Sequence, residues 1–258
     1  AQRYNNVWLN NATTPSSETD SRAFSFDVLP SSLIDNMMIY KSPSAELPAD
    51  FSGGFVRVMT KNIPDGNTFN VSYQMGFNTN ATFRNFQLTD GTAKDYLGFG
   101  ADVRNLPSSF PAHLGEHSTD EAAAFTRQIN QRWGINKFTA IPDQKISLTS
   151  HRSYDVGGWK IGNITNLNWS TEFDYSETVN NNYIAYDVKN DVSRPRFEYN
   201  DIRYKNTSKL GALFNWSFQR DGSKYELRNF FSQRGVSALT QREGMNYYSD
   251  KDIRKWES

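Results

Sequence analysis

Long segments in which apolar and polar side chains alternate strictly limit what this chain can fold into. Within residues 68–78 and 209–219 every second position is aromatic or aliphatic, and within 159–175 six of the nine alternate positions are. Because successive side chains of a strand point to opposite faces, each segment predicts a strand with one apolar face. Such strands exceed the ~5–6 residues usual in soluble sandwiches and match the length of a membrane-crossing strand.

The apolar faces of these strands are predicted to contact lipid. The opposite faces carry mainly Asn, Ser, Gln and Gly, which suit a polar interior. The predicted lipid-facing residues are Phe69, Val71, Tyr73, Leu167, Trp169, Phe173, Leu210, Phe214 and Trp216. The sequence therefore predicts a mainly β fold that contains antiparallel transmembrane strands.

Charge and hydropathy exclude some classes of protein. The chain has 28 basic and 28 acidic side chains, so it lacks the positive field that attracts nucleic acid. Its mean hydropathy is -0.71, and it contains no apolar run long enough for a membrane-spanning helix. Half-polar membrane strands also have a low mean hydropathy, and the aromatic content of 14% is typical of interfacial aromatic girdles.

Residues suited to catalysis or metal binding form no convincing motif. Cysteine is absent, which excludes disulfides, thiolate metal sites and cysteine nucleophiles. His113 and His117 have the spacing of a helical metal-binding pair, but Pro111 and Gly115 oppose a helix there. We therefore expect no enzyme activity, no metal and no cofactor. The first residues contain no signal peptide, and we expect the chain to be a fragment of a longer protein.

The remaining pattern predicts shorter elements and their connections. Strands are expected at 3–9, 37–41, 55–61, 145–154 and 224–242, with a helical turn near Leu33 and Ile34 and a helix at 120–133 capped by Thr119. Short turns at 155–158 and 220–223 alternate with long polar loops at 176–203 and after 244, where no further strand is expected. About five long strands are too few to close a single-chain barrel, which needs at least ~8.

Short motifs in the first 64 residues carry a resemblance to a known family. They are RYNNVWLN at 3–10, RAFSFD at 22–27, IDN with YK between 34 and 41, and DFSGG with TK between 50 and 61. These motifs resemble the end of the plug domain of TonB-dependent outer-membrane receptors, in particular the large transporters of Bacteroidota. The residues that carry the match are Arg3, Tyr4, Asn5, Arg22, Phe26, Lys41, Gly53, Gly54, Thr60 and Lys61.

The resemblance implies a fold, a location and an activity. Residues 1–64 would be the C-terminal part of a small α+β plug, and residues 65–258 the first strands and loops of a 22-stranded transmembrane β-barrel in the bacterial outer membrane. Such receptors take up a scarce solute, here a glycan, peptide or siderophore-like ligand, with energy from the TonB complex. The implied partners are that complex, outer-membrane lipid and a surface lipoprotein lid or larger outer-membrane complex, with no nucleic acid.

Two other functions and two local features remain open at this stage. The chain could be a non-transporting scaffold subunit of an outer-membrane complex, or a soluble β-sandwich that binds carbohydrate.

Gly53 and Gly54 are interpreted as a close backbone approach or a positive φ before the last plug strand, with ligand contact as the alternative. Lys41, Arg57 and Lys61 form an ionic latch with Glu172 or Asp174 in one hypothesis, and are solvated lumen charges in the other.

Overall fold

The computed structural model describes residues 5–14, 16, 24, 26, 29, 33–48, 54–64, 66–100, 105–129 and 134–247, and the backbone of 251–257. These residues form two compact units. Unit 1 contains residues 1–74, 145–170 and 209–234, and unit 2 contains residues 75–144, 171–208 and 235–258. This division follows compactness, so a functional boundary at residue 64 stays a prediction.

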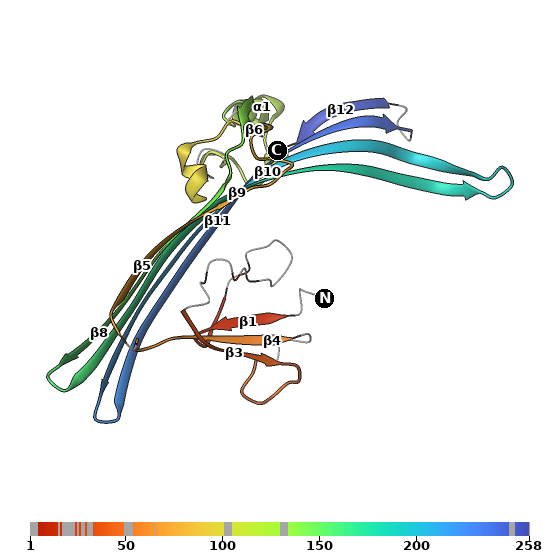
Figure 1. Ribbon diagram of the computed structural model, residues 1–258. Coiled ribbons are helices and arrows are strands. Elements are labelled where there is room, and N and C mark those ends of the chain that lie inside the picture. The colour runs from red at the N-terminus through yellow and green to blue at the C-terminus, as the bar shows by residue number, and fades with distance from the viewer. Residues whose placement is uncertain are drawn as a thin grey trace. The chain divides into compact units, whose positions relative to one another are not determined.

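A small four-stranded sheet in unit 1 contains the N-terminal strands, in the order β2-β1-β4-β3 (Figure 1). Its strands are β1 (Asn6–Leu9), β2 (Ala12–Thr13), β3 (Ile34–Tyr40) and β4 (Phe55–Thr60). The central strand β4 pairs in parallel with β1 and antiparallel with β3. The strands expected around 37–41 and 55–61 are therefore present, whereas Ile34, expected in a helical turn, begins β3.

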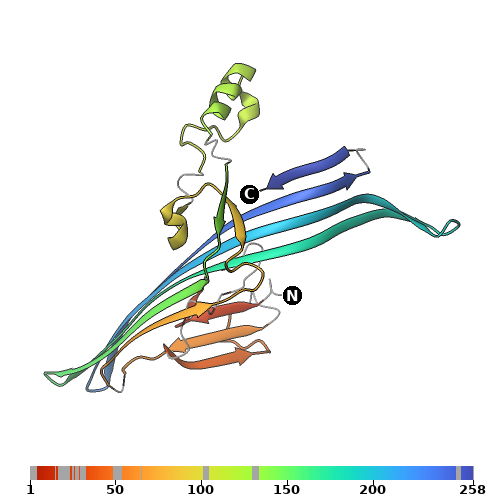
Figure 2. The same ribbon diagram turned by 45° about the horizontal axis from the view of Figure 1, so that its top comes forward.

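A larger sheet has six strands in the order β12-β11-β10-β9-β8-β5 (Figure 2). Its strands are β5 (Thr68–Gly76), β8 (Asp143–Val156), β9 (Trp159–Asp187), β10 (Val192–Arg220), β11 (Ser223–Asn246) and β12 (Lys251–Glu257). This confirms the mainly β fold class. β5 and β12 occupy the two ends of the order, so the described sheet is open rather than a closed barrel.

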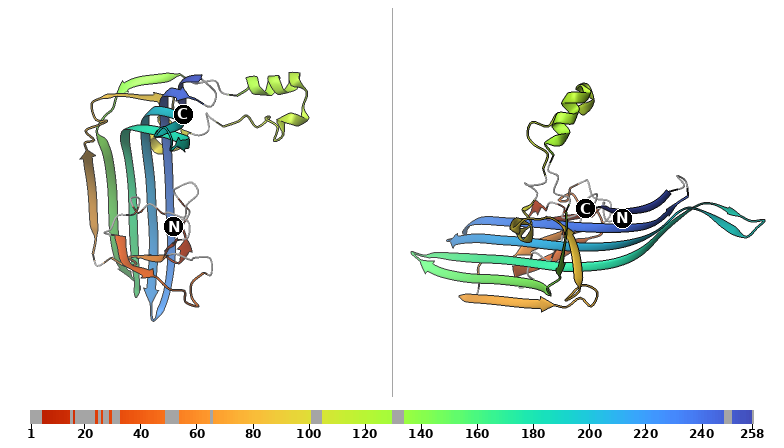
Figure 3. Two further views of the ribbon diagram at one scale, coloured as in Figure 1. Left: turned by 90° about the vertical axis from the view of Figure 1, so that its right-hand side faces the viewer. Right: turned by 90° about the horizontal axis from the view of Figure 1, so that it is seen from above.

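Two tight hairpins follow from glycines at the predicted short turns (Figure 3). Between β8 and β9, Gly157 has φ 58° and Gly158 has φ 81°. Between β10 and β11, Asp221 has φ 46° and Gly222 has φ 80°. Two-residue connections with positive φ at both positions match the right-handed twist of the strands they join.

The predicted polar loop at 176–203 is wrong, because β9 and β10 occupy most of it. Their connection is short, and the Asp187 carboxylate accepts hydrogen bonds from the backbone nitrogens of Lys189 (3.1 Å) and Asn190 (3.3 Å). Likewise, β12 pairs antiparallel with β11 where no strand was expected. In residues 176–203, apolar side chains such as Val179, Ile184 and Phe197 follow no strict alternation, so the pattern that identifies a strand in a sequence is missing.

Unit 2 contains a second ladder and a helical insertion. β6 (Asn85–Thr89) pairs antiparallel with β7 (Ile135–Thr139), and between them lie η4 (Ala93–Leu97), η6 (Leu114–Glu116) and α1 (Thr119–Arg127). The cap of α1 is Ser118 rather than Thr119, because its hydroxyl accepts from the Glu121 backbone while the Glu121 carboxylate accepts from the Ser118 backbone. None of the described helices is long and apolar enough to cross a membrane.

Candidate functional site

The covered face of the large sheet in unit 1 is polar. Asn166 and Asn168 of β9 are buried, as are Asn215 and Ser217 of β10. The amide nitrogen of Asn166 donates to Thr149 Oγ1 at 2.9 Å, and that of Asn168 donates to Asn166 Oδ1 at 2.9 Å. Hydrogen bonds therefore offset the desolvation of these amides.

The opposite face of the same strands is apolar and exposed. Leu167 of β9 is 49% exposed and Phe214 of β10 is 44% exposed, and the rings of Phe214, Trp216 and Phe218 stand in contact along β10. β5 continues this pattern with Phe69, Val71, Tyr73 and Met75 all exposed. A sheet that buries amides and exposes aromatic rings reverses the arrangement usual in soluble antiparallel sheets.

The small sheet covers this polar face within unit 1. Leu9 and Val58 of the small sheet, together with Leu33, form a buried cluster with Ile164 of β9 and Leu213 of β10. Gly162 of β9 allows a close backbone approach. A Cβ at this position would lie 3.0 Å from the Ile63 Cα and 3.1 Å from the Asn62 carbonyl oxygen. A side chain at this position would therefore push the neighbouring backbone away by a few tenths of an ångström.

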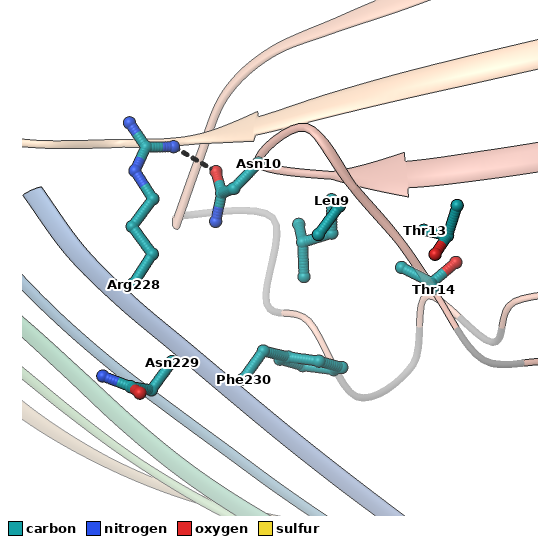
Figure 4. A pocket seen from close by; sticks show the side chains of 8 residues that line it. Leu9, Asn10, Thr13, Thr14, Arg228, Asn229 and Phe230 are labelled. Atoms are coloured by element: carbon teal, nitrogen blue, oxygen red, sulfur yellow. Dashed lines mark hydrogen bonds between the residues drawn. The ribbon is translucent and has the colours of Figure 1, made fainter. Parts of the chain in front are cut away.

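A hydrogen-bonded network joins the same two sheets, and we call it the polar joint. It consists of Asn10, Thr60, Asn62, Asn215, Glu226 and Arg228. The Arg228 guanidinium donates to the side-chain oxygens of Asn10 and Asn62, as Figure 4 shows for Asn10, and to Glu226 Oε2 at 2.8 Å. Thr60 is 1% exposed.

Asn10 and Thr60 extend the polar joint from the small sheet to β10. The Asn10 side-chain oxygen also accepts from the Thr60 backbone nitrogen at 2.9 Å, and the Asn215 amide donates to Thr60 Oγ1 at 3.0 Å. Asn10 has φ 53°, a left-handed conformation that asparagine tolerates better than most residues. The turn after β1 therefore aims an amide oxygen at the large sheet.

A cavity of about 270 Å³ lies beside the polar joint (Figure 4). Leu9, Thr13 and Thr14 line it from the small-sheet side, and Arg228 and Phe230 line it from β11. Because Arg228 is already engaged by three side chains, we interpret this space as incomplete packing between the two sheets. A joint with a cavity and hydrogen bonds is easier to separate than a fully packed apolar core.

The structure brings two of the predicted plug-motif residues together, Asn5 and Gly54. The Gly54 backbone nitrogen donates to Asn5 Oδ1 at 2.9 Å, and the Gly54 carbonyl accepts from the Asn6 nitrogen. A Cβ at Gly54 would lie 3.8 Å from Asn5, an ordinary contact, and this glycine is not among those with positive φ. For Gly54, the interpretation as a close backbone approach or a positive φ is therefore wrong.

The other motif residues have different surroundings. Thr60 belongs to the polar joint, and the Lys61 nitrogen donates to the Leu33 carbonyl at 2.9 Å. Lys41 is exposed, and Phe26 packs edge-on against Phe24 with ring centroids 5.2 Å apart. Arg3, Tyr4, Arg22 and Gly53 lie outside the described residues.

The hypothetical ionic latch gains no support from the observed pairs. The Arg57 guanidinium donates to Asn11 Oδ1 at 2.8 and 2.5 Å, and Asp174 lies 3.3 Å from Lys205 Nζ. The charged residue that joins the two sheets is Arg228, which sequence reasoning missed. It lies on a strand with irregular alternation, and its partners are more than 150 positions away, except for Glu226.

The predicted lipid-facing residues divide into three groups by exposure. Phe69, Val71, Tyr73, Leu167 and Phe214 are exposed, whereas Trp169, Leu210 and Trp216 are half-buried. Phe173 departs from the expectation because it is only 2% exposed. Its ring lies 5.4 Å from that of Phe86 and 6.2 Å from that of Phe138, which belong to the β6–β7 ladder of unit 2. Lipid contact of the other residues stays a prediction.

Comparisons with known proteins identify no relative. No family model, no curated protein and no solved structure matches the chain. Within the described ranges, no three His, Asp or Glu side chains come together as metal ligands, and His117 instead lies 3.8 Å from Glu121. The arrangement that stands out is therefore a contact surface, the polar joint, rather than a set of reactive groups.

Proposed function

We propose that this chain is the plug-to-barrel part of a TonB-dependent outer-membrane receptor that takes up a scarce solute. The observation that carries the proposal is the reversed polarity of the large sheet in unit 1. Its buried face carries hydrogen-bonded amides such as Asn166 and Asn215 beside one small apolar cluster, and its exposed face carries aromatic and aliphatic side chains. Membrane barrels place polar groups inside and apolar groups toward lipid.

The polar joint supports the transport mechanism in particular. In this proposal the small sheet is the end of the plug, and it must separate from the wall of the barrel when TonB pulls. Hydrogen bonds such as that from Asn215 to Thr60 can be exchanged for hydrogen bonds to water in a hydrated lumen. The net cost of breaking each one is then only about 0.5–1.5 kcal/mol. The apolar cluster around Leu33 and Ile164 is small, so it orients the small sheet against the large one without preventing their separation.

The alternative of a soluble carbohydrate-binding sandwich agrees less well with this pattern. A soluble sheet would have to keep Phe69, Val71, Tyr73 and Phe214 in water while it buries Asn166 and Asn215. Exposed apolar patches of this extent mark an interaction surface in a soluble protein. A scaffold barrel without transport activity remains the competing function, and it predicts a plug that never moves.

A cross-link across the polar joint separates transport from scaffolding. The chain has no cysteine, so Thr60→Cys with Asn215→Cys introduces the only thiol pair into these residues. In the full-length receptor in its native bacterium, a short cleavable thiol cross-linker should abolish uptake, and reductive cleavage should restore it. The control pair is Met38→Cys with Arg57→Cys, which are register partners within the small sheet and should leave uptake unchanged.

The outcomes of this experiment are distinct. Uptake that continues when the Thr60–Asn215 pair is fully cross-linked would favour the scaffold function. Recovery of the full-length protein from the soluble fraction, without detergent, would exclude both membrane functions. Loss of uptake in the control pair as well would attribute the loss to the linker itself and would contradict the assignment of the effect to the polar joint.

A further inference from the structure

Unit 2 contains a cavity of about 600 Å³ that the arguments above do not use. Three aromatic rings line it, from Phe83, Tyr175 and Tyr204, and the rings of Tyr175 and Tyr204 pack edge-on with centroids 5.2 Å apart. Asn80, Arg84 and Glu177 supply polar and charged groups to the same wall. Aromatic walls with a few convergent polar groups are typical of small-molecule sites.

The turn that presents Phe83 is fixed by several hydrogen bonds. The Asn78 carbonyl accepts from the Thr82 nitrogen at 2.8 Å, and the Phe83 nitrogen donates to the Ala140 carbonyl at 2.9 Å. Phe83 itself has φ 60° and is 68% exposed. A bulky residue held in this left-handed conformation is strained, and strain of this kind accumulates at ligand-binding positions. The turn therefore holds an aromatic ring out of the protein core at a cost in energy.

Arg84 and Glu177 line the same cavity but do not pair with each other in the described structure. Arg84 uses its Nε to donate to the Thr79 carbonyl at 2.9 Å, and its two terminal nitrogens form no hydrogen bond or ion pair with the described residues. Glu177 accepts one hydrogen bond, from the Tyr175 hydroxyl to its Oε1. The cavity thus presents unused guanidinium donors and an available carboxylate oxygen as two separate, opposite charges.

We propose that this cavity binds a zwitterionic ligand, a short peptide with both termini free. The peptide carboxylate pairs with the terminal nitrogens of Arg84, the ammonium group pairs with Glu177, and an apolar side chain packs against Phe83 and Tyr204. A simple anion would meet the repulsion of Glu177, and a simple cation would meet that of Arg84. A neutral glycan would leave both charges without a counter-ion. This inference rests on the proposed function and names its substrate class.

Binding of defined peptides to the purified full-length receptor in detergent tests the assignment. The probe is the dipeptide Ala-Phe, measured by calorimetry beside its C-terminal amide, its N-acetyl form and maltotriose. Each blocked peptide should bind about tenfold or more weakly than free Ala-Phe, because each loses one charge-assisted interaction. Maltotriose should not bind at this cavity.

Two substitutions assign each charge to its partner. In Arg84→Gln, free and amidated peptides should bind equally, because the partner of the carboxylate is gone. In Glu177→Gln, which keeps an acceptor for the Tyr175 hydroxyl, free and acetylated peptides should bind equally. The matched control is Arg203→Gln, an exposed arginine beside Tyr204 that does not line the cavity, and it should bind all probes like the unmodified protein.

The results that overturn the inference are specific. They are an absence of binding by Ala-Phe, equal binding of all three peptides to the unmodified protein, or maltotriose binding that both substitutions weaken. An unchanged thermal midpoint in Arg84→Gln and Glu177→Gln shows that these variants fold. The cross-link in unit 1 tests the proposed transport function separately. Peptide binding can therefore fail while the cross-link still abolishes uptake, and peptide binding can succeed while the cross-link leaves uptake unchanged.

Discussion

The two units cover the large sheet in different ways. In unit 1 the small sheet meets the strands mainly through amides, a hydroxyl and Arg228, with one modest apolar cluster. In unit 2 the β6–β7 ladder covers the strands through rings, since Phe86 lies within 5.6 Å of the ring centroids of Phe138, Phe173 and Tyr204. Hydrogen bonds can be exchanged with water, whereas an aromatic core cannot. The difference predicts a separable cover in unit 1 and a permanent one in unit 2.

The largest expected effect concerns the aromatic cover. Phe86 is fully buried, so Phe86→Ala should lower the free energy of unfolding by about 3–5 kcal/mol through lost burial and a cavity. Urea unfolding of the detergent-solubilised protein measures this change, and limited proteolysis should cut β6 or β7 first. An effect below about 1 kcal/mol would mean that the ladder is not held by its rings, and the contrast between the units would fail.

The next effect tests the close approach in unit 1. Gly162→Val places side-chain atoms against the backbone of Asn62 and Ile63, and overpacking of this kind costs about 1–3 kcal/mol. The small sheet should become sensitive to protease while the β6–β7 ladder stays protected. Gly66→Ala is the control, because a Cβ at Gly66 meets nothing within 4 Å. Equal protection of the small sheet in both variants would contradict the close contact.

A smaller effect is expected at the polar joint itself. Arg228→Met keeps much of the apolar stem of the side chain but removes the donors that reach Asn10, Asn62 and Glu226. We expect a loss of about 1–2 kcal/mol, since water can replace part of the network. Solvent exchange of the Thr60 amide, whose acceptor is Asn10, should rise by about tenfold. A loss as large as that of Phe86→Ala would mean that unit 1 is as permanently covered as unit 2.

The sequence predicts those strands and turns that have a local signal, either alternation of apolar and polar residues or a pair of glycines. Alternation identified β5, the first half of β9 and the second half of β10, and Gly157 and Gly158 identified a hairpin. The polar halves of β9 and β10 were missed because their pairing depends on each other and not on a buried apolar face. Local pattern therefore predicts that a strand is present better than it predicts how far the strand extends.

The site was less predictable because it depends on distant contacts. The motifs near the N-terminus did include Thr60, which bonds to Asn10, and Asn5 and Gly54, which bond to each other. No local sequence pattern identifies Arg228 as the partner of Asn10, because the two residues are 218 positions apart. Nothing local shows that Phe173 is covered by a ladder from the insertion rather than by lipid. A period of two assigns side chains to a face, but it does not say what covers that face.

The smallest expected effect concerns α1, which has no buried residue and so represents the least packed part of unit 2. The hydrogen bond from the Ser118 backbone, followed by that from its hydroxyl, lowers the pKa of Glu121 below its ordinary value of 4.5. A lowered pKa in the folded state means that the cap stabilises α1 fully above about pH 4.5. This contribution is lost as the pH falls through the lowered value. In NMR spectra of the full protein, α1 resonances should shift toward coil values in that window, while those of β6 and β7 do not.

Glu121→Gln, which accepts the same hydrogen bond without titrating, should remove the pH dependence of the α1 resonances. If it persists in this variant, the cap is not its cause, and the contrast between the capped helix and the packed ladder needs another explanation.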